Sequence, residues 1–208
     1  MYPLKIIGLG PGHRDYILPI AKKEIEAAEV ILCGVRHAES FDTKGKEMLY
    51  IGRGTPLKDL MEEVAGLYKT KKTALVVSGD CGFYSLLSYA KKVIPTKDIV
   101  CIPGISSLQY FFAKLNLTWE DAELVSLHGR KTDLLPALIE NKKLGLLTDK
   151  SHNTAFIAKT MLASGMENSI IYVGEELSYA NEKITKLTIK EALDFKEEGM
   201  AVVVIVNE

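Results

Sequence analysis

The sequence predicts an α/β protein with two lobes, in which the first lobe holds a mostly parallel sheet and the second a mixed sheet. Short apolar runs rich in β-branched residues alternate with stretches whose apolar residues recur at helical spacing. The runs of the first half are continuously apolar, which is typical of strands covered on both faces. The pattern changes after about Trp119, so we expect one lobe in residues 1–118 and another in residues 119–208.

The first lobe is expected to contain four strands, each ending at or close to a glycine or proline. They are Leu4–Leu9, Val30–Cys33, Thr73–Val77 and Ile99–Ile102. Apolar spacing predicts helices over Ile17–Ala28 and Pro56–Lys69, and Pro19 falls in the first turn of the former, where a missing N–H is harmless. Two further helices are expected, one beginning near Phe83 and one running to Leu115. Strands and helices in this order form right-handed crossovers.

The second lobe is expected to follow a link at Leu117–Asp121 and to contain five strands and three helices. The predicted strands are Glu123–Leu127, Leu144–Thr148, Ser169–Val173, Lys183–Thr188 and Met200–Val206. The predicted helices are Leu134–Glu140, Thr154–Ala163 and Ile189–Phe195. No internal repeat or low-complexity tract interrupts either lobe.

The composition is that of an ordinary globular protein. Of the 208 residues, 47% are hydrophobic and 25% charged, which excludes general disorder. The 26 basic and 27 acidic side chains nearly cancel, so the chain lacks the basic excess of a nucleic-acid-binding domain. The longest uncharged run, Ile99–Ala113, is too short to span a membrane, and Lys5 interrupts the apolar stretch at the N-terminus. We therefore expect a cytoplasmic protein that binds neither nucleic acid nor a membrane.

The cysteines and histidines do not form a recognisable metal site. Cys33, Cys81 and Cys101 are odd in number, widely spaced and without a Cys-x-x-Cys pair, so we interpret them as buried thiols of a reducing compartment. No two of the four histidines have metal-ligand spacing, such as four residues apart on a helix. We expect no metal ion bound by the protein itself.

A glycine-rich loop, Gly8–Gly12, follows the first strand but does not fit the dinucleotide-binding fingerprint. His13 stands where the third glycine belongs, Pro11 removes a backbone N–H, and the second strand ends at Cys33-Gly34 without a carboxylate. Three glycines leave the loop without side-chain cover, which favours close backbone approach to some other ligand. A tight turn with no ligand remains the alternative.

Two more loops follow predicted strands, Ser78–Gly82 and Pro103–Ser107. Ligands of open parallel sheets bind at the carboxyl edge of the strands, where both loops are expected to lie. The alternative is that Asp80 caps the helix near Phe83 and that Ser106 and Ser107 cap the helix after them. Three such loops at one edge favour a ligand site.

The three loops, in this order and spacing, resemble those of the tetrapyrrole methylase family, and the resemblance covers essentially the whole chain. That family uses S-adenosylmethionine in a cleft between two α/β lobes. Ser126–Arg130, Gly34–His37 and Tyr172–Tyr179 are similar to the branch that methylates carbon 5 of precorrins. Cys81 departs from the family, which usually has proline there, and Leu18 departs at the usual threonine or serine cap of the first helix.

The resemblance implies an S-adenosylmethionine-dependent C-methyltransferase of cobalamin biosynthesis, acting on carbon 5 of cobalt-precorrin-7 or its metal-free counterpart and forming a homodimer. Any cobalt would arrive with the substrate. Some relatives carry a fused domain that methylates carbon 15 and removes a carboxylate, so here that activity is expected on a separate protein. A sister methylase acting at another tetrapyrrole position, or on a protein as diphthine synthase does, stays open as an alternative. So does a non-catalytic binder of tetrapyrroles or nucleotides.

The resemblance also implies site residues. The cofactor is expected to contact Gly79, Asp80, Cys81, Ser106 and Ser107 in the first half of the chain and Thr148, Leu177 and Ala201 in the second. The turn Gly10-Pro11-Gly12 is expected to face the tetrapyrrole. Methyl transfer from a sulfonium is an in-line displacement with an activated donor, so it requires alignment and exclusion of water more than a nucleophile. We interpret Cys81 accordingly as a small loop thiol.

The four arginines are Arg14, Arg36, Arg53 and Arg130, and each lies within two residues of a glycine in a predicted loop. The planar guanidinium suits carboxylates better than the lysine ammonium does. We predict that Arg14, Arg36 and Arg130 bind the acetate and propionate groups of the substrate, with a chance result of a lysine-biased composition as the alternative. His128, at a predicted strand end between the lobes, is the candidate to orient substrate or move a proton after methylation.

Overall fold

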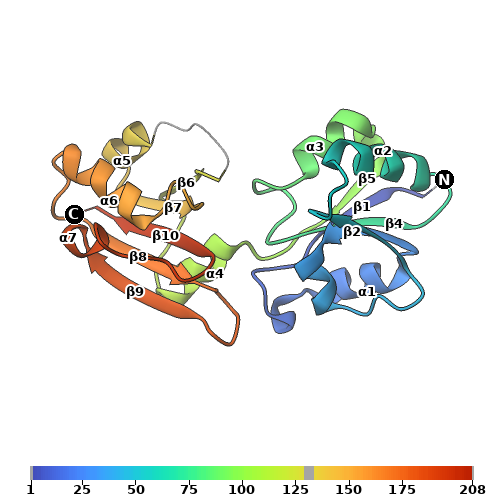
Figure 1. The fold of residues 1–208 in the computed structure, drawn as a ribbon, viewed down its shortest axis with the longest axis horizontal. Helices are drawn as coiled ribbons and strands as arrows, with labels where there is room; N and C mark the ends of the chain where they lie inside the picture. Colours follow the sequence, from blue (N-terminus) through green and yellow to red (C-terminus); the bar gives the residue numbers. More distant parts are fainter. Residues whose placement is uncertain (1, 129–133, 208) are drawn as a thin grey trace. The chain divides into compact units, whose positions relative to one another are not determined.

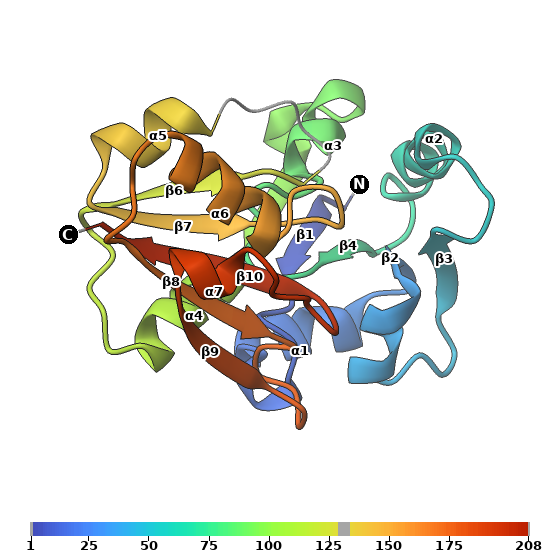
Figure 2. The same ribbon diagram turned by 60° about the vertical axis from the view of Figure 1, so that its left-hand side comes forward.

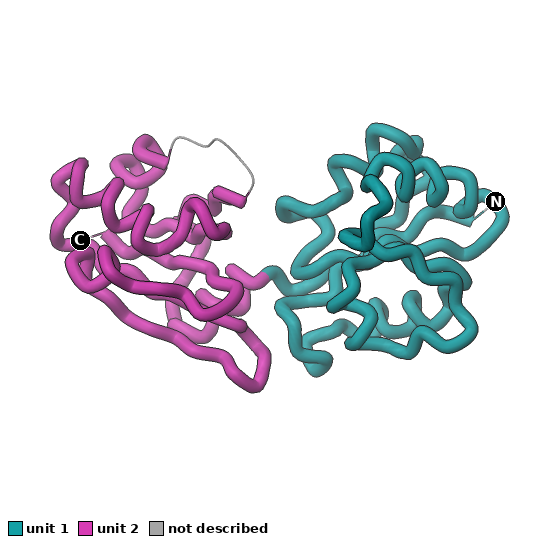
Figure 3. The backbone as a smooth tube through the Cα atoms, in the orientation of Figure 1, with its two compact units in different colours: residues 1–106 teal, residues 107–208 magenta. Residues whose placement is uncertain are grey.

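A computed structural model describes residues 2–128 and 134–207 (Figure 1). Its internal contacts divide the chain into two compact units, Met1–Ser106 and Ser107–Glu208 (Figure 3). Each unit has its own five-stranded sheet and its own hydrophobic core. The predicted fold class, two α/β lobes, is confirmed.

Unit 1 is built on a parallel sheet with the strand order β3-β2-β4-β1-β5. Its strands are β1 Leu4–Gly8, β2 Val30–Gly34, β3 Glu47–Ile51, β4 Thr73–Val77 and β5 Ile99–Ile102. All four strand pairs are parallel. The sequence analysis missed β3, which lies at the edge of the sheet and keeps all five of its residues at least partly exposed. An edge strand needs a less continuous apolar run, so its signal is weaker.

Helices cover both faces of this sheet. On one face α1, Pro19–Ala27, packs Ala21 and Ile25 against strand residues such as Ile7. On the other face lie α2, Leu57–Leu67, and α3, Leu87–Val93. Three 3₁₀ turns complete the unit: Arg14–Tyr16, Val35–Ser40 and Thr96–Asp98.

The expectation of three buried thiols is wrong for one of them. Cys33 and Cys81 are buried, but Cys101 is exposed. Cys101 lies on β5, which has a neighbouring strand on one side only. A thiol on such an edge strand is covered less than Cys33 on β2, which has a neighbouring strand on each side.

Unit 2 is built on a mixed sheet with the strand order β6-β7-β10-β8-β9. Its strands are β6 Ala122–Ser126, β7 Lys143–Leu147, β8 Ile170–Glu175, β9 Lys183–Thr188 and β10 Ala201–Val206. β6 and β7 pair in parallel, whereas the other three pairs are antiparallel. The helices α5 Leu135–Glu140, α6 Thr154–Ala163 and α7 Ile189–Ala192 share one core with one face of the sheet (Figure 2).

The opposite face of this sheet carries α4, Ser107–Lys114, which packs on β7 and β10. Two glycines allow its close approach. A Cβ at Gly145 would lie 3.1 Å from Cε2 of Phe112, and one at Gly174 would lie 3.0 Å from the ring of Phe111. Because α4 packs on this sheet, the boundary between the units falls after Ser106. The sequence analysis placed it twelve residues later, at 118.

None of the described helices is long and apolar enough to cross a membrane.

Candidate functional site

In unit 1, the three loops predicted to bind a ligand lie in close backbone contact at the carboxyl edge of β1, β4 and β5. They are Gly8–Gly12, Ser78–Gly82 and Pro103–Ser107. A Cβ on Gly8 would lie 2.6 Å from the carbonyl oxygen of Gly79, and one on Gly104 would lie 2.2 Å from the same atom. Real side chains do not tolerate such contacts with backbone atoms, so each position accepts only glycine. The adjacent strand order β4-β1-β5 is what brings the loops together.

The glycine loop after β1 is bonded directly to the loop after β4. The N–H of Gly79 donates to the carbonyl of Gly10 at 2.8 Å, and the N–H of Gly10 donates back to the Gly79 carbonyl at 3.2 Å. Both residues have left-handed φ angles, +91° and +63° respectively for Gly10 and Gly79. The glycines that suggested close approach to a ligand therefore also allow close approach between the loops.

Asp80 joins the second loop to the third. One carboxylate oxygen accepts from the N–H of Gly82 at 2.8 Å, and the other accepts from the N–H of Gly104 at 3.1 Å. α3 begins at Leu87 rather than near Phe83, so Asp80 is not the cap of that helix. Its side chain instead satisfies backbone donors within the loops.

Cys81 belongs to the second loop, and its side chain is buried in the core of unit 1, at 5% exposure. Burial, with smaller contributions from the neighbouring Cys101 and Asp80, raises the pKa of its thiol to about 12. The hydroxyl of Ser85 donates to the carbonyl of Cys81, which ties the second loop to the residues that follow it. At neutral pH the thiol is protonated, which agrees with its interpretation as a structural loop residue.

The third loop ends at the boundary between the units. Ser106 is buried, at 6% exposure, and closes unit 1. Ser107 is the first residue of α4 and belongs to unit 2. Ser107 therefore starts the helix that packs on the second sheet, and Ser106 directly precedes it.

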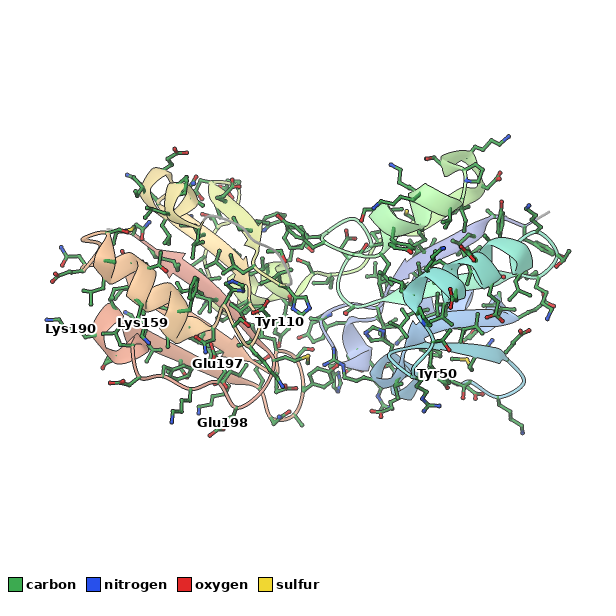
Figure 4. The ribbon with its side chains drawn as sticks, turned by 45° about the horizontal axis from the view of Figure 1, so that its top comes forward. Tyr50, Tyr110, Lys159, Lys190, Glu197 and Glu198 are labelled. Atoms are coloured by element: carbon green, nitrogen blue, oxygen red, sulfur yellow. The ribbon has the colours of Figure 1, made fainter. Side chains whose placement is uncertain are left out.

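Three arginines follow strands of the parallel sheet at its carboxyl edge. Arg14 lies in the 3₁₀ turn after β1, Arg36 in that after β2, and both are exposed. Arg53, which the carboxylate hypothesis left out, follows β3, and its guanidinium lies 4.3 Å from the ring centroid of Tyr50 (labelled in Figure 4). Recognising β3 would have put Arg53 at the same edge. Arg130 lies outside the described residues.

His37 lies next to Arg36 and is half-buried. Burial lowers the pKa of its imidazole, and the charge of Arg36 lowers it further, against the opposing effect of a hydrogen bond with the backbone of Val76. Its Nδ1 is buried without a hydrogen-bond partner among the described residues. The ring is therefore neutral at neutral pH, and Arg36 carries the positive charge of this turn.

Unit 2 brings its three predicted cofactor residues to one edge of the mixed sheet. The hydroxyl of Thr148, just beyond β7, donates to the carbonyl of Ala201 at the start of β10, at 2.7 Å. Ala201 pairs in register with Glu175 at the end of β8, and Leu177 follows two residues later. Residues far apart in the sequence thus meet where β7, β10 and β8 end or begin.

His128 lies at the same edge, beyond β6. Its Nδ1 is 3.4 Å from the carbonyl oxygen of Thr148, and the residue is exposed. The residues that follow it, 129–133, lie outside the described part of the chain. His128 and Thr148 are therefore neighbours, as the strand order β6-β7 requires.

Glu182, which the sequence analysis did not single out, anchors the segment that carries Leu177. Its carboxylate accepts from the N–H of Ser178 at 2.6 Å and from the hydroxyl of Tyr110 at 2.6 Å, and it lies 2.8 Å from Nζ of Lys114. Tyr110 is labelled in Figure 4. Tyr110 and Glu182 are 72 residues apart in the chain, so no sequence pattern links them.

Burial alone would raise the pKa of Glu182, but the hydrogen bonds from Lys114, Tyr110 and Ser178 outweigh it and hold that pKa below its ordinary value. The carboxylate is therefore ionised under ordinary conditions, and charge-assisted hydrogen bonds of this kind are the strong ones.

Comparisons with known proteins point to one family and one fold. A family model described as Tetrapyrrole (Corrin/Porphyrin) Methylases matches residues 3–193. The chain is 33% identical over 201 residues to a probable cobalt-precorrin-7 C(5)-methyltransferase of Methanocaldococcus jannaschii, with 89% of each chain covered. It is 29% identical over 202 residues to the cobalt-precorrin-7 C(5)-methyltransferase of Salmonella typhimurium, covering 97% of this chain and 98% of the relative.

A solved structure with the same fold is the uroporphyrin-III C-methyl transferase of Thermus thermophilus, complexed with S-adenyl homocysteine. The TM-score is 0.81 at 17% identity, with 98% of this chain and 97% of that chain covered. At this identity the likeness shows the fold alone.

Proposed function

The chain belongs to the tetrapyrrole (corrin/porphyrin) methylase family, and on this premise we propose that it methylates carbon 5 of cobalt-precorrin-7, or of its metal-free counterpart, in cobalamin biosynthesis. The family makes it an S-adenosylmethionine-dependent C-methyltransferase. The choice of acceptor is supported by the names of relatives that align with nearly the whole chain.

The single observation that carries the cofactor proposal is the contact of Gly8, Gly79 and Gly104. Gly8 and Gly104 carry no side chain at this point of the carboxyl edge, so backbone groups of three loops are available there to a ligand. We propose that the donor lies against Gly79, Asp80, Cys81, Ser106 and Ser107 of unit 1 and Thr148, Leu177 and Ala201 of unit 2. Both oxygens of Asp80 already accept backbone N–H groups, so Asp80 shapes the loops for the cofactor.

When bound, the cofactor supplies a methyl group already activated on a sulfonium sulfur. The protein then has to align the acceptor carbon with that methyl group and keep water away. No protein nucleophile is required, and the protonated thiol of Cys81 is unsuited to be one. With its Nδ1 toward the carbonyl of Thr148, His128 has Nε2 left to orient substrate or to accept a proton after methylation.

The substrate carries several carboxylates, and we propose that Arg14, Arg36 and Arg130 bind them, with Arg53 added by its position after β3. Arg14→Ala or Arg36→Ala should raise KM for the tetrapyrrole about tenfold or more, because a bidentate charged contact is lost. Arg36→Lys should recover only part of it, whereas Lys44→Ala, at an exposed lysine, is the control. Unchanged KM in folded variants would reject the role.

Binding and turnover test the function separately. Calorimetric titration with S-adenosylhomocysteine should show binding, and NAD should show none. Labelled S-adenosylmethionine should then transfer its methyl group to cobalt-precorrin-7, and the labelled position should be carbon 5. Binding without transfer to any tetrapyrrole would favour a non-catalytic binder, while transfer to another position or to a protein would identify a sister methylase.

We also propose that the protein forms a homodimer. Light scattering of the purified protein tests this proposal, and a monomeric mass would reject it.

A further inference from the structure

The segment between β8 and β9 carries Leu177 in a backbone conformation that needs outside support. Glu176 and Ser178, on either side of Leu177, both have left-handed φ angles, +44° and +70°. Neither is glycine, so each conformation is unfavourable by itself and persists only where surrounding contacts determine it. The support therefore has to be found in the contacts of this segment.

Part of the support comes from the neighbouring strand. The N–H of Glu176 donates to the carbonyl of Met200 at 2.9 Å, and the carboxylate of Glu176 accepts from the N–H of Met200 at 2.8 Å. These bonds hold the beginning of the segment beside the start of β10. They do not reach Ser178. The N–H of Tyr179 also donates to the carbonyl of Glu176 at 3.0 Å, which closes a turn around Leu177 and Ser178.

Further support comes from the side chain of Glu182. Its carboxylate accepts from the N–H of Ser178 in its own segment and from Tyr110 and Lys114 on α4. Tyr110 and Lys114 are four residues apart and so lie on the same face of that helix. With 17% of its side chain exposed, the carboxylate is largely shielded from water, which strengthens all three contacts.

α4 is also the helix that begins at Ser107, a proposed cofactor residue. Leu177 lies over Gly174, where a Cβ would be 2.7 Å from Cδ2 of Leu177 and 3.0 Å from the ring of Phe111 on α4. One carboxylate thus couples the helix that follows the third loop to the segment that carries Leu177.

We infer that Glu182 is a positioning residue for methyl-donor binding: by holding Ser178 to Tyr110 and Lys114, it fixes Leu177 against α4. This inference rests on the proposed function, because Leu177 and Ser107 are proposed cofactor contacts. It adds a residue that touches neither donor nor substrate.

The test compares Glu182→Gln and Tyr110→Phe with the control Glu191→Gln. Glu191 is a carboxylate of the same unit that accepts from Thr188 at the start of α7, so it also contributes to structure. Each variant is titrated with S-adenosylhomocysteine, assayed for methyl transfer, and checked for fold by circular dichroism and thermal unfolding.

Glu182→Gln should weaken S-adenosylhomocysteine binding and raise KM for the donor about tenfold, because a charged acceptor of three hydrogen bonds is lost. kcat at saturating donor should change much less. Tyr110→Phe should act in the same direction but more weakly, and the double variant should be less than additive. Glu191→Gln should lower the unfolding temperature with no change in donor affinity.

Donor affinity within twofold of wild type in a folded Glu182→Gln protein would overturn the inference. So would an equal loss of affinity in Glu191→Gln, since the effect would then be general destabilisation. If Glu182→Gln does not fold, Tyr110→Phe decides by the same criteria. Failure of the wild-type protein to bind S-adenosylhomocysteine would instead reject the proposed function.

Discussion

Gly8, Gly79 and Gly104 come from loops that are far apart in the sequence, and Gly8 and Gly104 must be glycine because the backbone of Gly79 lies against them. The carbonyl oxygen of Gly79 occupies the space that a Cβ on either of the other two would need. A residue without a side chain is thus required by tertiary contact rather than by the local turn. Because of this contact, no side chain projects from Gly8 or Gly104 at the carboxyl edge of the sheet.

At this scale we predict that Gly104→Ala destabilises the protein and removes donor binding. The new Cβ would lie 2.2 Å from the Gly79 carbonyl and 2.7 Å from the Gly8 carbonyl carbon, so backbone must move, at a cost of about 1–3 kcal/mol or more. Gly66→Ala in α2 is the matched control, because nothing lies within 4 Å of its Cβ position. It should be neutral or stabilise by up to about 1 kcal/mol. Urea unfolding and calorimetry measure both, and a Gly104→Ala protein with wild-type stability and affinity would contradict the prediction.

The three thiols should differ in reactivity. Burial raises the pKa of Cys33 to about 11 and that of Cys81 to about 12, whereas Cys101 is exposed. Iodoacetamide near pH 8 should therefore label Cys101 in the folded protein and all three residues in urea, as read by peptide mass spectrometry. Labelling of Cys81 as fast as Cys101 would show that the second loop opens in solution.

Among the helices and loops, the short ones depend for their stability on hydrogen bonds from side chains at their ends. α7, Ile189–Ala192, has four residues and is capped by Thr188. The hydroxyl of Thr188 accepts from the N–H of Glu191, while the Glu191 carboxylate accepts from the N–H of Thr188. α4 has eight residues and is held to the β8–β9 segment by Glu182. In both cases one carboxylate joins elements whose own hydrogen bonds would not suffice.

The ionised form of Glu182 should make part of the stability depend on pH. Its pKa is held below the ordinary 4.5, because hydrogen bonds from Lys114, Tyr110 and Ser178 outweigh the raising effect of burial. The folded state therefore binds the proton less readily than the unfolded state, so the contribution is present above the unfolded pKa and disappears as pH falls through the folded one.

We expect the difference in free energy of unfolding between wild type and Glu182→Gln to be constant near neutral pH and to shrink below about pH 4.5. Urea titrations at several pH values measure it. Glu62→Gln is the control, since Glu62 forms an exposed ion pair with Lys58 at 3.7 Å and should contribute little at any pH. A difference for Glu182→Gln that grows in acid would have the wrong sign.

At the scale of the whole molecule, the chain is two units with separate cores. The core clusters of unit 1 draw their buried residues from 4–102, and that of unit 2 draws them from 125–205. Leu108, Phe111 and Phe112 of α4 are fully buried, and Phe111 and Phe112 lie against the two glycines of the second sheet. The helix therefore belongs with unit 2, although it follows directly from a loop of unit 1.

This division predicts how fragments behave. Residues 1–106 should fold by themselves, with cooperative thermal unfolding and a monomeric elution volume. Residues 1–118 should associate, because α4 would expose Leu108, Phe111 and Phe112 without the sheet that covers them. Circular dichroism and size-exclusion chromatography distinguish the two, and a monomeric 1–118 fragment more stable than 1–106 would place α4 in unit 1 instead.

The two α/β lobes, nine of the ten strands in the described residues and the three loops of the resemblance could be predicted from the sequence. They depend on local patterns: apolar runs, helical spacing, and glycines after strands. It missed β3, whose edge position leaves a weak apolar signal, and with it the place of Arg53. Bounds of helices were less well predicted, as α3 shows, since glycine and serine loops do not mark where a helix begins.

Features that depend on contacts between residues far apart in the chain could be found only from the three-dimensional structure. α4 belongs to unit 2 because its phenylalanines pack on Gly145 and Gly174, which lie in strands later in the chain. The roles of Asp80 and Glu182 follow from backbone and side-chain donors 24 and 72 residues away. Local patterns predict how a segment folds, but they do not indicate which hydrogen-bond donors lie near a carboxylate in the folded protein.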